Sequence, residues 1–401
     1  MKIALATGDG KMVAQHFGHT PLFVIAEVDE NGWQIMETRV NTPACDRGEH
    51  SHAQFAAGAA LISDCAAVIA AKIGPFAQNG LSAMGITPLE KTGFCEEILD
   101  GYARYLARKN SPGRGYRPPG RHPCFDTGGG GEYGRLHLPV SALCNIKCRF
   151  CARDINADEL RPGVTAGILR PAQAEDAVAR ALELCPVLAV VGVAGPGDAL
   201  ADGAALETFR LVRGRFPHLA LCLSTNGLGL MDRVAELRDV GVRHLTVTVN
   251  AADPAVGAKI VSQVTLGGQV YTGPAAARLL LDRQRAGLEA AAAAGMEIKV
   301  NTVLIPGVND RHIEEIARAA AALGAKTHNI MPLIPQGEFA DAVAPDCLML
   351  EKARAEAEAH LPVFRRCAHC RADACGIPGV SDFSRELYSG AFEFSCGNAC
   401  G

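Results

Sequence analysis

The sequence predicts an α/β protein made of two units joined by a linker. Short runs rich in Val, Ile and Leu alternate with amphipathic stretches of helical period, the pattern of strands and helices that follow one another along a chain. A segment crowded with Gly, Pro and Arg, residues 109–134, interrupts this pattern. With 401 residues, 48% of them hydrophobic and 20% charged, the chain is long enough for two globular domains.

Composition and charge narrow the possible functions. The formal net charge of -4 gives no general reason to expect a nucleic acid or an anionic membrane as partner. Met1 and Lys2 lead directly into a strand-like run, and no apolar stretch reaches the roughly 18 residues of a membrane helix, so we expect a cytoplasmic protein. Fifteen cysteines without a secretion signal favour metal ligation over disulfides. Cys185 and Cys222 lie inside apolar segments and are expected to be small buried residues.

The first unit, residues 1–108, is predicted to be a small α/β domain. Its strand-like runs are 2–7, 23–28, 33–40 and 66–71, and its helix-like stretches are 52–61 and 94–109. His16 and His19 flank Phe17 and Gly18 in this unit. The two histidines either ligate a metal or stand in solvent beside a simple turn.

The second unit, residues 135–379, is predicted to be a partial (βα)6 barrel with a parallel sheet. Six strand-like runs occupy 135–140, 187–195, 219–227, 244–250, 297–307 and 327–335. Helix-like segments separate them at 171–185, 203–215, 230–240, 274–295 and 310–324. In such a sheet, ligands bind at the carboxyl ends of the strands, where the loops lie.

Three cysteines follow the first strand of this unit in the run CNIKCRFC: Cys144, Cys148 and Cys151. This spacing lets one loop ligate three irons of a [4Fe-4S] cluster and leaves the fourth iron open for another ligand. The alternative is half of a zinc site. The run resembles the motif of the radical SAM enzymes, in which the open iron chelates the amino and carboxylate groups of S-adenosylmethionine (SAM). Phe150 matches the aromatic residue that is usual before the last cysteine.

Polar and glycine residues mark the carboxyl ends of the later strands. Glycines let the backbone approach a ligand closely, carbonyl groups can accept hydrogen bonds from the SAM ammonium, and hydroxyls and amides can orient its ribose and carboxylate. Alternatively, each turn only reverses the chain. The residues expected to bind SAM are Gly195, Gly197, Asp198, Ser224, Thr225, Asn226, Thr248, Asn250 and Asn301.

Two other short segments carry metal-ligand types. His122 and Cys124 stand together inside the linker, and Cys367 and Cys370 have cluster or zinc spacing, with Arg371 and Asp373 close behind. The alternative for the second segment is a zinc half-site completed by Cys375, Cys396 or Cys400. The tail, residues 380–401, carries the last two of these cysteines, which either cap a cluster or remain mobile thiols.

Nine motifs of the second unit together resemble the NifB family of radical SAM proteins, which build the iron-sulfur core of the nitrogenase cofactors. The resemblance covers residues 121–379, and its motifs are HPCF, CNIKCRFC, ELRPGV, AGPGDAL, LCLSTNGL, TVTVNAADP, KVNTVLIPGVND, NIMPLIP and CAHCRADACG. The first unit resembles the NifX and NafY type of cofactor-binding domain, a ribonuclease H-like fold, through HFGHTPLFVIAEV, Asp64 before CAAVIAAKIG, and GLSAMGITP.

The resemblance implies a reaction on clusters. Two auxiliary [4Fe-4S] clusters are the substrates, one SAM gives a methyl group, a second supplies the 5'-deoxyadenosyl radical, and the carbon ends as a carbide in an eight-iron precursor. It also implies cluster donors, a downstream carrier or scaffold protein, and an electron donor such as ferredoxin or flavodoxin as partners.

On the family pattern, Cys144, Cys148 and Cys151 hold the SAM cluster. The residues matched to the auxiliary clusters are His122, Cys124, Cys367 and Cys370. Glu159 matches an acidic residue that is either a labile iron ligand, part of a proton path, or a salt-bridge partner of Arg161.

Two departures from the family pattern stand out. Residues 152–162 lack the further cysteine that helps to hold an auxiliary cluster, so Cys375 or the tail pair are possible substitutes. The cofactor-binding domain precedes the barrel instead of following it. Two other functions therefore stay open: a radical SAM maturase with auxiliary clusters that acts on a peptide or other substrate, and a cluster carrier without turnover.

Overall fold

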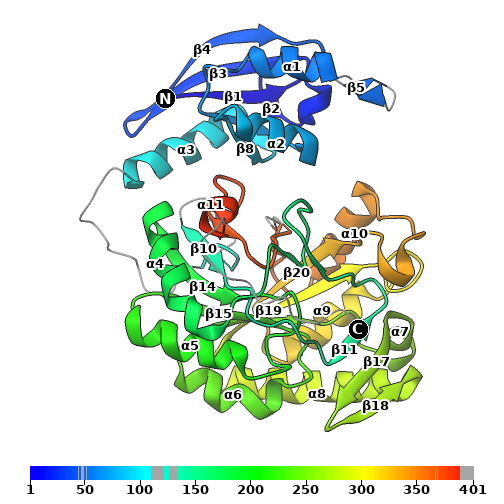
Figure 1. Ribbon diagram of the computed structural model, residues 1–401. Coiled ribbons are helices and arrows are strands. Elements are labelled where there is room, and N and C mark those ends of the chain that lie inside the picture. Colours follow the sequence, from blue (N-terminus) through cyan, green and yellow to red (C-terminus); the bar gives the residue numbers. More distant parts are fainter. Residues whose placement is uncertain are drawn as a thin grey trace.

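The computed structural model contains two α/β domains, with the amino-terminal domain above the larger one in Figure 1. The structure describes residues 1–43, 45–46, 49–50, 52–109, 122–125, 133–365, 367 and 369–388. Most of the linker and most of the tail, including Cys396 and Cys400, lie outside the described residues.

The amino-terminal domain is built on a five-stranded sheet of order β4-β3-β1-β7-β8. Its strands are β1 (Lys2–Thr7), β3 (Leu22–Asp29), β4 (Gly32–Val40), β7 (Ala67–Ala70) and β8 (Thr87–Glu90). The first three are antiparallel, whereas β7 and β8 run parallel to β1. This mixed order is the one expected of a ribonuclease H-like domain, and the predicted fold class is confirmed.

Helices cover both faces of this sheet. They are α1 (His52–Ala60), α2 (Pro75–Ala83) and α3 (Cys95–Lys109), and the short strands are β2 (Met12–Val13), β5 (Cys45–Asp46), β6 (Glu49–His50) and β9 (Gly93–Phe94). Because successive strand residues point to opposite faces, Ile3 and Leu5 pack with α3, and Ala4 packs in a separate cluster with Phe23 and Ile25.

The second domain contains a seven-stranded sheet of order β20-β19-β16-β15-β14-β10-β21. The strands are β10 (Gly134–His137), β14 (Leu188–Val193), β15 (Ala220–Thr225), β16 (Val242–Thr248), β19 (Glu297–Leu304), β20 (Thr327–Pro332) and β21 (Cys375–Gly376). The first six are mutually parallel, and β21 adds an antiparallel edge to β10. This is the predicted partial (βα)6 barrel.

Helices lie along the outside of the curled sheet (Figure 1). They are α4 (Ala174–Leu184), α5 (Ala204–Arg215), α6 (Leu230–Asp239), α8 (Gly273–Ala293), α9 (Ile313–Ala322) and α10 (Cys347–Glu358). The predicted helices match α4, α5, α6, α8 and α9 to within three residues at each end. Within the described part of the chain, no helix is both long and apolar enough to cross a membrane.

A three-stranded sheet not predicted from the sequence stands beside the barrel. It is formed by β11 (Ile146–Cys148), β17 (Val261–Leu266) and β18 (Gln269–Thr272), and α7 (Pro254–Ile260) leads into it. Gly267 and Gly268 turn the hairpin with φ of 59° and 81°, a conformation that suits glycine at both positions. Because β11 pairs with β17, this sheet holds the loop that carries Cys148.

The two domains share one apolar cluster. Leu99 and Tyr102 of α3 belong to it, and so do Ile377 and Val380, which follow β21. A hydrogen bond of 2.6 Å from Arg385 Nη2, in α11 (Ser384–Tyr388), to Asn79 Oδ1 in α2 adds a polar contact. The segment after β21 therefore joins the barrel to the amino-terminal domain.

We predict that His328 makes the free energy of unfolding depend on pH. This β20 side chain is fully buried, its Nε2 lies 2.8 Å from Thr302 Oγ1, and burial lowers the pKa of His328 to about 4. Above pH 6.5 the imidazole is neutral in both states. Below that pH the unfolded chain binds a proton that the folded protein does not, so the free energy of unfolding falls, by about 3 kcal/mol when pH 4 is reached.

Anaerobic denaturant unfolding of the protein and of His328→Gln between pH 8 and pH 4 checks this. The free energy of unfolding of the variant should fall less steeply as the pH is lowered, because the contribution of His328 is absent. The difference between the two proteins at pH 8 sets the baseline, and a difference that stays constant down to pH 4 contradicts the prediction.

Candidate functional site

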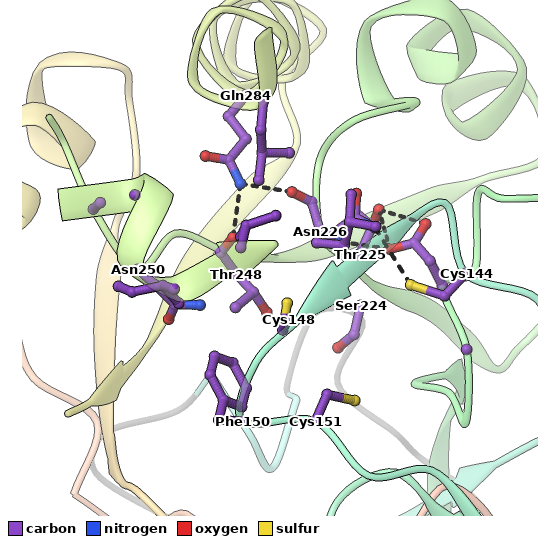
Figure 2. Close-up of a pocket in the computed structure, with 18 of the residues that line it drawn as sticks. Cys144, Cys148, Phe150, Cys151, Ser224, Thr225, Asn226, Thr248, Asn250 and Gln284 are labelled. Carbon is purple, nitrogen blue, oxygen red and sulfur yellow. Dashed lines mark hydrogen bonds between the residues drawn. The ribbon is translucent and has the colours of Figure 1, made fainter. Parts of the chain in front are cut away.

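A pocket opens at the carboxyl ends of the barrel strands (Figure 2). Cys144, Cys148 and Cys151 line one side of it, and the strand ends of β14, β15 and β16 line the other. Apolar side chains of α7 and α8 form the rest of its wall. The pocket therefore combines sulfur ligands, polar strand ends and an apolar wall in one place.

The cysteine loop leaves β10 and enters the small sheet through β11. Figure 2 shows Cys148 and Cys151 near Ser224, whereas Cys144 lies beside Asn226. Burial raises the pKa of all three thiols, that of Cys144 to about 11. Iron would replace these protons on binding, because a thiolate is the form of cysteine that ligates metal.

Asp198 connects the cysteine loop to two strand ends. It follows β14 with only 3% of its surface exposed, and both of its carboxylate oxygens accept a hydrogen bond of 3.0 Å from Thr225 Oγ1. The backbone N–H of Asn226 donates to Oδ2 at 2.5 Å, and the N–H of Asp198 itself donates to Leu143 O at 2.7 Å. Burial raises the pKa of Asp198 although these hydrogen bonds oppose the shift.

Gln284 is a site residue that the sequence analysis missed. Its side-chain Nε2 donates to Asn226 O at 2.7 Å and to Thr248 O at 2.9 Å, so this residue of α8 ties the ends of β15 and β16 together. Figure 2 shows both bonds. A buried glutamine on the face of α8 that meets the sheet is the signal in the sequence, but that face is known only once the helix is placed.

Arg153 is a second missed residue and the cation of the pocket lining. Its Nη1 donates to Ala142 O at 3.0 Å. Its charge opposes the rise that burial causes in the pKa of Cys144, Cys148 and Cys151. A guanidinium at this position favours three thiolates over three thiols.

Most residues predicted to bind SAM line this one pocket. They are Phe150, Gly197, Asp198, Ser224, Thr225, Asn226, Thr248 and Asn250. Gly195 and Asn301 are outside the lining. Asn301 Oδ1 accepts a 3.1 Å hydrogen bond from Asn329 Nδ2, and the Asn329 side chain is also hydrogen-bonded to Cys367. Asn301 therefore belongs with a second group of sulfur residues.

That group, called here the auxiliary cysteine cluster, consists of Cys124, Cys222, Cys367 and Cys370. The Cys124 thiol is close enough to the other three for their charges to interact, and burial raises the pKa of Cys124 to about 11 and of Cys222 to about 12. His122 stands beside it, with its Nδ1 accepting a 3.1 Å hydrogen bond from Cys124 N–H. The structure thus brings His122 and Cys124 of the linker close to the segment after β20.

Cys222 was expected to be a small buried residue, but it faces the auxiliary cysteine cluster. It alternates along β15 with Leu221 and Leu223, which are buried against the helices. A Cβ added at Gly192 of the neighbouring β14 would lie 2.4 Å from Cys222 Sγ. The alternation of leucines on either side of Cys222 was the signal that this thiol points to the opposite face of the strand.

Glu159 lies in the segment that lacks the expected cysteine. Its carboxylate accepts hydrogen bonds of 2.6 Å from Arg161 Nε and 3.0 Å from Asn156 Nδ2, so the salt bridge with Arg161 is present. Arg371 donates to the carbonyls of Glu159 and Asn156 and pairs with Asp373 at 2.8 Å. Arg371 and Asp373 therefore hold this segment in place, and no thiol is among the partners found for them in the described structure.

The proposed substitute Cys375 lies elsewhere. It is fully buried on β21 in the apolar core of the barrel, where its thiol interacts with that of Cys185. Within the described ranges, no three His, Cys, Asp or Glu side chains converge on a position that could hold a single metal ion.

His16 and His19 lie together on the amino-terminal domain. A short 3-10 turn, Phe17–His19, carries the buried Phe17 inward and leaves both imidazoles exposed, with ring centroids 6.0 Å apart. Phe17 N–H donates to Lys72 O at 2.8 Å. The charge of Lys72 in turn reaches His369, which separates Cys367 from Cys370. The histidine pair thus lies on the side of its domain that carries Lys72.

Two family models match the chain. Residues 1–105 match the model described as dinitrogenase iron-molybdenum cofactor, and residues 138–320 match the radical SAM superfamily. The first match ends within α3, near the end of the amino-terminal domain, whereas the second begins just after β10 and ends within α9, before β20, α10 and β21.

Relatives match about two thirds of the chain at more than 40% identity. The FeMo cofactor biosynthesis protein NifB of Methanocaldococcus infernus is 42% identical over 269 residues, which are 67% of this chain and 89% of the relative. The NifB of Chlorobaculum tepidum is 43% identical over 262 residues, 64% of this chain and 62% of the relative. The chain thus spans about three-fifths of the length of the Chlorobaculum tepidum protein.

Similarity to solved structures is weaker. A radical SAM methyltransferase from Sphaerobacter thermophilus aligns with a TM-score of 0.41 and 20% identity over 58% of this chain and 64% of the other. Methylornithine synthase aligns with a TM-score of 0.39 and 13% identity over 57% of this chain and 63% of the other.

The contact between Gly197 and the cysteine loop leads to a prediction. A Cβ at Gly197 would lie 2.0 Å from Leu143 O, next to Cys144, whereas a Cβ at Gly203 would meet no atom within 4 Å. Gly197→Ala should therefore displace the loop, lower the free energy of unfolding by about 1–3 kcal/mol, and reduce the iron retained after anaerobic reconstitution. Gly203→Ala is the matched control. Equal iron contents and melting temperatures in the two variants would show that the contact is unimportant.

Proposed function

Because the chain belongs to the NifB family of FeMo cofactor biosynthesis proteins, we propose that it is a radical SAM enzyme that assembles the iron-sulfur core of the nitrogenase cofactor. The proposed reaction fuses two [4Fe-4S] clusters, its substrates, around one carbon from a SAM methyl group. One further sulfur enters, and the product is an eight-iron precursor with a central carbide. The pocket that joins the three cysteines to the polar strand ends supports this proposal most directly.

The residues present fit a [4Fe-4S] cluster and SAM. Cys144, Cys148 and Cys151 provide three sulfur ligands at one wall of the pocket, and Arg153 provides a cation beside them. Such a cluster, with one iron open to SAM, supplies the electron that cleaves the sulfonium of SAM. The apolar wall formed by Ile260, Val261, Ala277 and Leu280 would exclude water from this chemistry.

The protein orients SAM through the ends of three strands. Asp198 fixes the loop after β14 against the loop after β15, so the backbone near Gly197 is held beside Cys144. Asn226 donates from Nδ2 to Asn145 Oδ1 at 2.7 Å and stands near Cys144 Sγ at 3.9 Å. Thr248 and Asn250 complete the rim at β16. These groups would set which bond of SAM faces the cluster.

The auxiliary cysteine cluster is the proposed binding site of the substrate clusters. Cys124, Cys367 and Cys370, with His122 beside them, are the residues that the family resemblance assigns to these clusters, and Cys222 adds a fourth thiol. We propose that Cys222 takes part in holding the cluster whose usual cysteine is missing from residues 152–162. Glu159 in that segment matches an acidic residue of the family, and its carboxylate is already paired with Arg161.

The amino-terminal domain is proposed to receive the product. Its exposed pair, His16 and His19, is a suitable set of iron ligands, and Lys72 next to it is close enough to His369 to influence it electrostatically. The partners in this proposal are cluster donors, a carrier or scaffold protein that takes the precursor, and a ferredoxin or flavodoxin that supplies electrons.

Anaerobic reconstitution with iron and sulfide tests the main proposal. The chain should bind about twelve irons if three cubes are present, form 5'-deoxyadenosine from SAM, and transfer label from the SAM methyl group into the cluster fraction. Cys148→Ala should abolish the cleavage of SAM, because one of the three cluster ligands is removed. Cys347→Ala, at an exposed cysteine of α10, is the matched control and should leave cleavage unchanged.

Other outcomes point to the alternatives. Binding of only four irons contradicts a reaction on auxiliary clusters. Twelve irons with SAM cleavage but without transfer of methyl label would favour a maturase that acts on a peptide or other substrate. Absence of SAM cleavage would favour a cluster carrier, and cleavage by Cys148→Ala would show that the cluster ligands were assigned wrongly.

The role of the histidine pair is tested in the full chain. The double variant His16→Ala and His19→Ala should still form labelled product, but more of that product should separate from the protein on anaerobic gel filtration, because two ligands are lost. His218→Ala, at an exposed position of the barrel, is the control. Equal retention by both variants would rule out ligation of the product by the pair.

A further inference from the structure

Arg135 is a buried cation whose partners include a thiol. It lies on β10 with 5% of its surface exposed, and its Nη2 is 3.0 Å from Cys370 Sγ, while its Nη1 donates to Gly376 O at 2.8 Å. The guanidinium therefore bonds to a sulfur atom and to a backbone carbonyl.

Lys299 is a second buried cation at the same place. This β19 residue is 5% exposed, and its Nζ donates to Cys124 O at 2.9 Å while lying 4.7 Å from the ring centre of Phe125. Its charge lies close enough to the thiols of Cys124, Cys222 and Cys367 to interact with all three. Lys299 thus acts on three thiols of the auxiliary cysteine cluster, and Arg135 acts on the fourth.

These two cations lack the partners that buried cations normally have. Within the described part of the chain, neither forms an ion pair with a carboxylate, although the charge of Asp382 reaches Arg135. Arg371, close by, has such a partner in Asp373. A buried charge without a counter-charge destabilises a fold by several kcal/mol. The positive charges of Arg135 and Lys299 are consequently balanced only when an anion is bound beside them.

Unsatisfied polar atoms around the cysteines support the same conclusion. Among the residues that the structure describes, Nε2 of His122, which is 4% exposed, finds no hydrogen-bond partner, and neither does Nε of Arg135. The side chain of Asn329 is 1% exposed, and its Oδ1 is also unpartnered. Buried polar atoms are usually satisfied in native proteins, so this concentration beside four thiols indicates a bound group.

We propose that Arg135 and Lys299 are positioning residues that hold the anionic substrate cluster at the auxiliary cysteine cluster. The inference rests on the proposed function, because it takes an iron-sulfur cluster as the anion. Thiolate-ligated clusters carry negative charge, which the two cations neutralise, and the N–H donor of Arg135 stabilises the sulfur of Cys370. Hydrogen bonds to cluster sulfur and local charge are the means by which proteins tune such clusters.

The test compares four charge variants with the parent protein after anaerobic reconstitution. Lys299→Met and Arg135→Met should each lose about four of about twelve irons, that is, one cluster. Lys299→Arg should retain the iron because it keeps the charge. Arg135→Lys should keep the iron but shift the auxiliary cluster to a lower reduction potential, because the hydrogen bond to Cys370 is lost.

Lys352→Met, at an exposed lysine of α10, is the control for the loss of one positive charge and should bind as much iron as the parent. Melting temperatures and the spectroscopic signal of the SAM cluster identify variants that have failed to fold. If the methionine variants do not fold, the results for Lys299→Arg and Arg135→Lys decide whether the inference holds. If the parent protein binds about twelve irons and the variants equal it in iron content and in reduction potential, this inference alone is overturned. A parent protein with only four irons would overturn the proposed function, and this inference with it.

Discussion

The buried carboxylate of Asp198 connects the loops on which the rest of the site depends. It accepts hydrogen bonds from the end of β15, and its own N–H holds the loop that carries Cys144. Because Asp198 is buried, loss of these bonds would leave several polar groups unsatisfied at once. Asp198 therefore holds the cysteine loop through its backbone N–H and the strand ends that would bind SAM through its carboxylate. Gln284 extends this network to β16.

The two groups of cysteines stand in different electrostatic surroundings. In the pocket, Arg153 is balanced by the buried Asp198, and both charges act on Cys144. At the auxiliary cysteine cluster, Arg135 and Lys299 face the thiols without forming an ion pair with a carboxylate in the described structure. The first arrangement suits a resident cluster with a ligand such as SAM, which carries both positive groups and a carboxylate. The second suits an anion that arrives and leaves, as a substrate cluster does.

The sequence predicted the repeating elements well, because each is set by local periodicity. Strands such as β14 and helices such as α9 follow from runs of apolar residues with period 2 or 3.6. The hairpin of β17 and β18 was missed although Gly267 and Gly268 mark its turn. Its strands are partly exposed, and the apolar residues of β17, Val261, Val264 and Leu266, do not alternate regularly with polar ones. In the site, cysteine spacing identified Cys144, Cys148 and Cys151, since one short loop contains all three.

The sequence by itself determined the two α/β folds, the group of three neighbouring cysteines and the polar strand ends, because these features depend on neighbours in the chain. Only the tertiary structure decided that Cys222 and Lys299 join Cys124, that Arg135 donates to Cys370, and that Cys375 does not belong with them. The contact between Arg135 and Cys370 spans 235 residues. Such contacts arise from the order and direction of strands in the sheet, and no local pattern of residues encodes them.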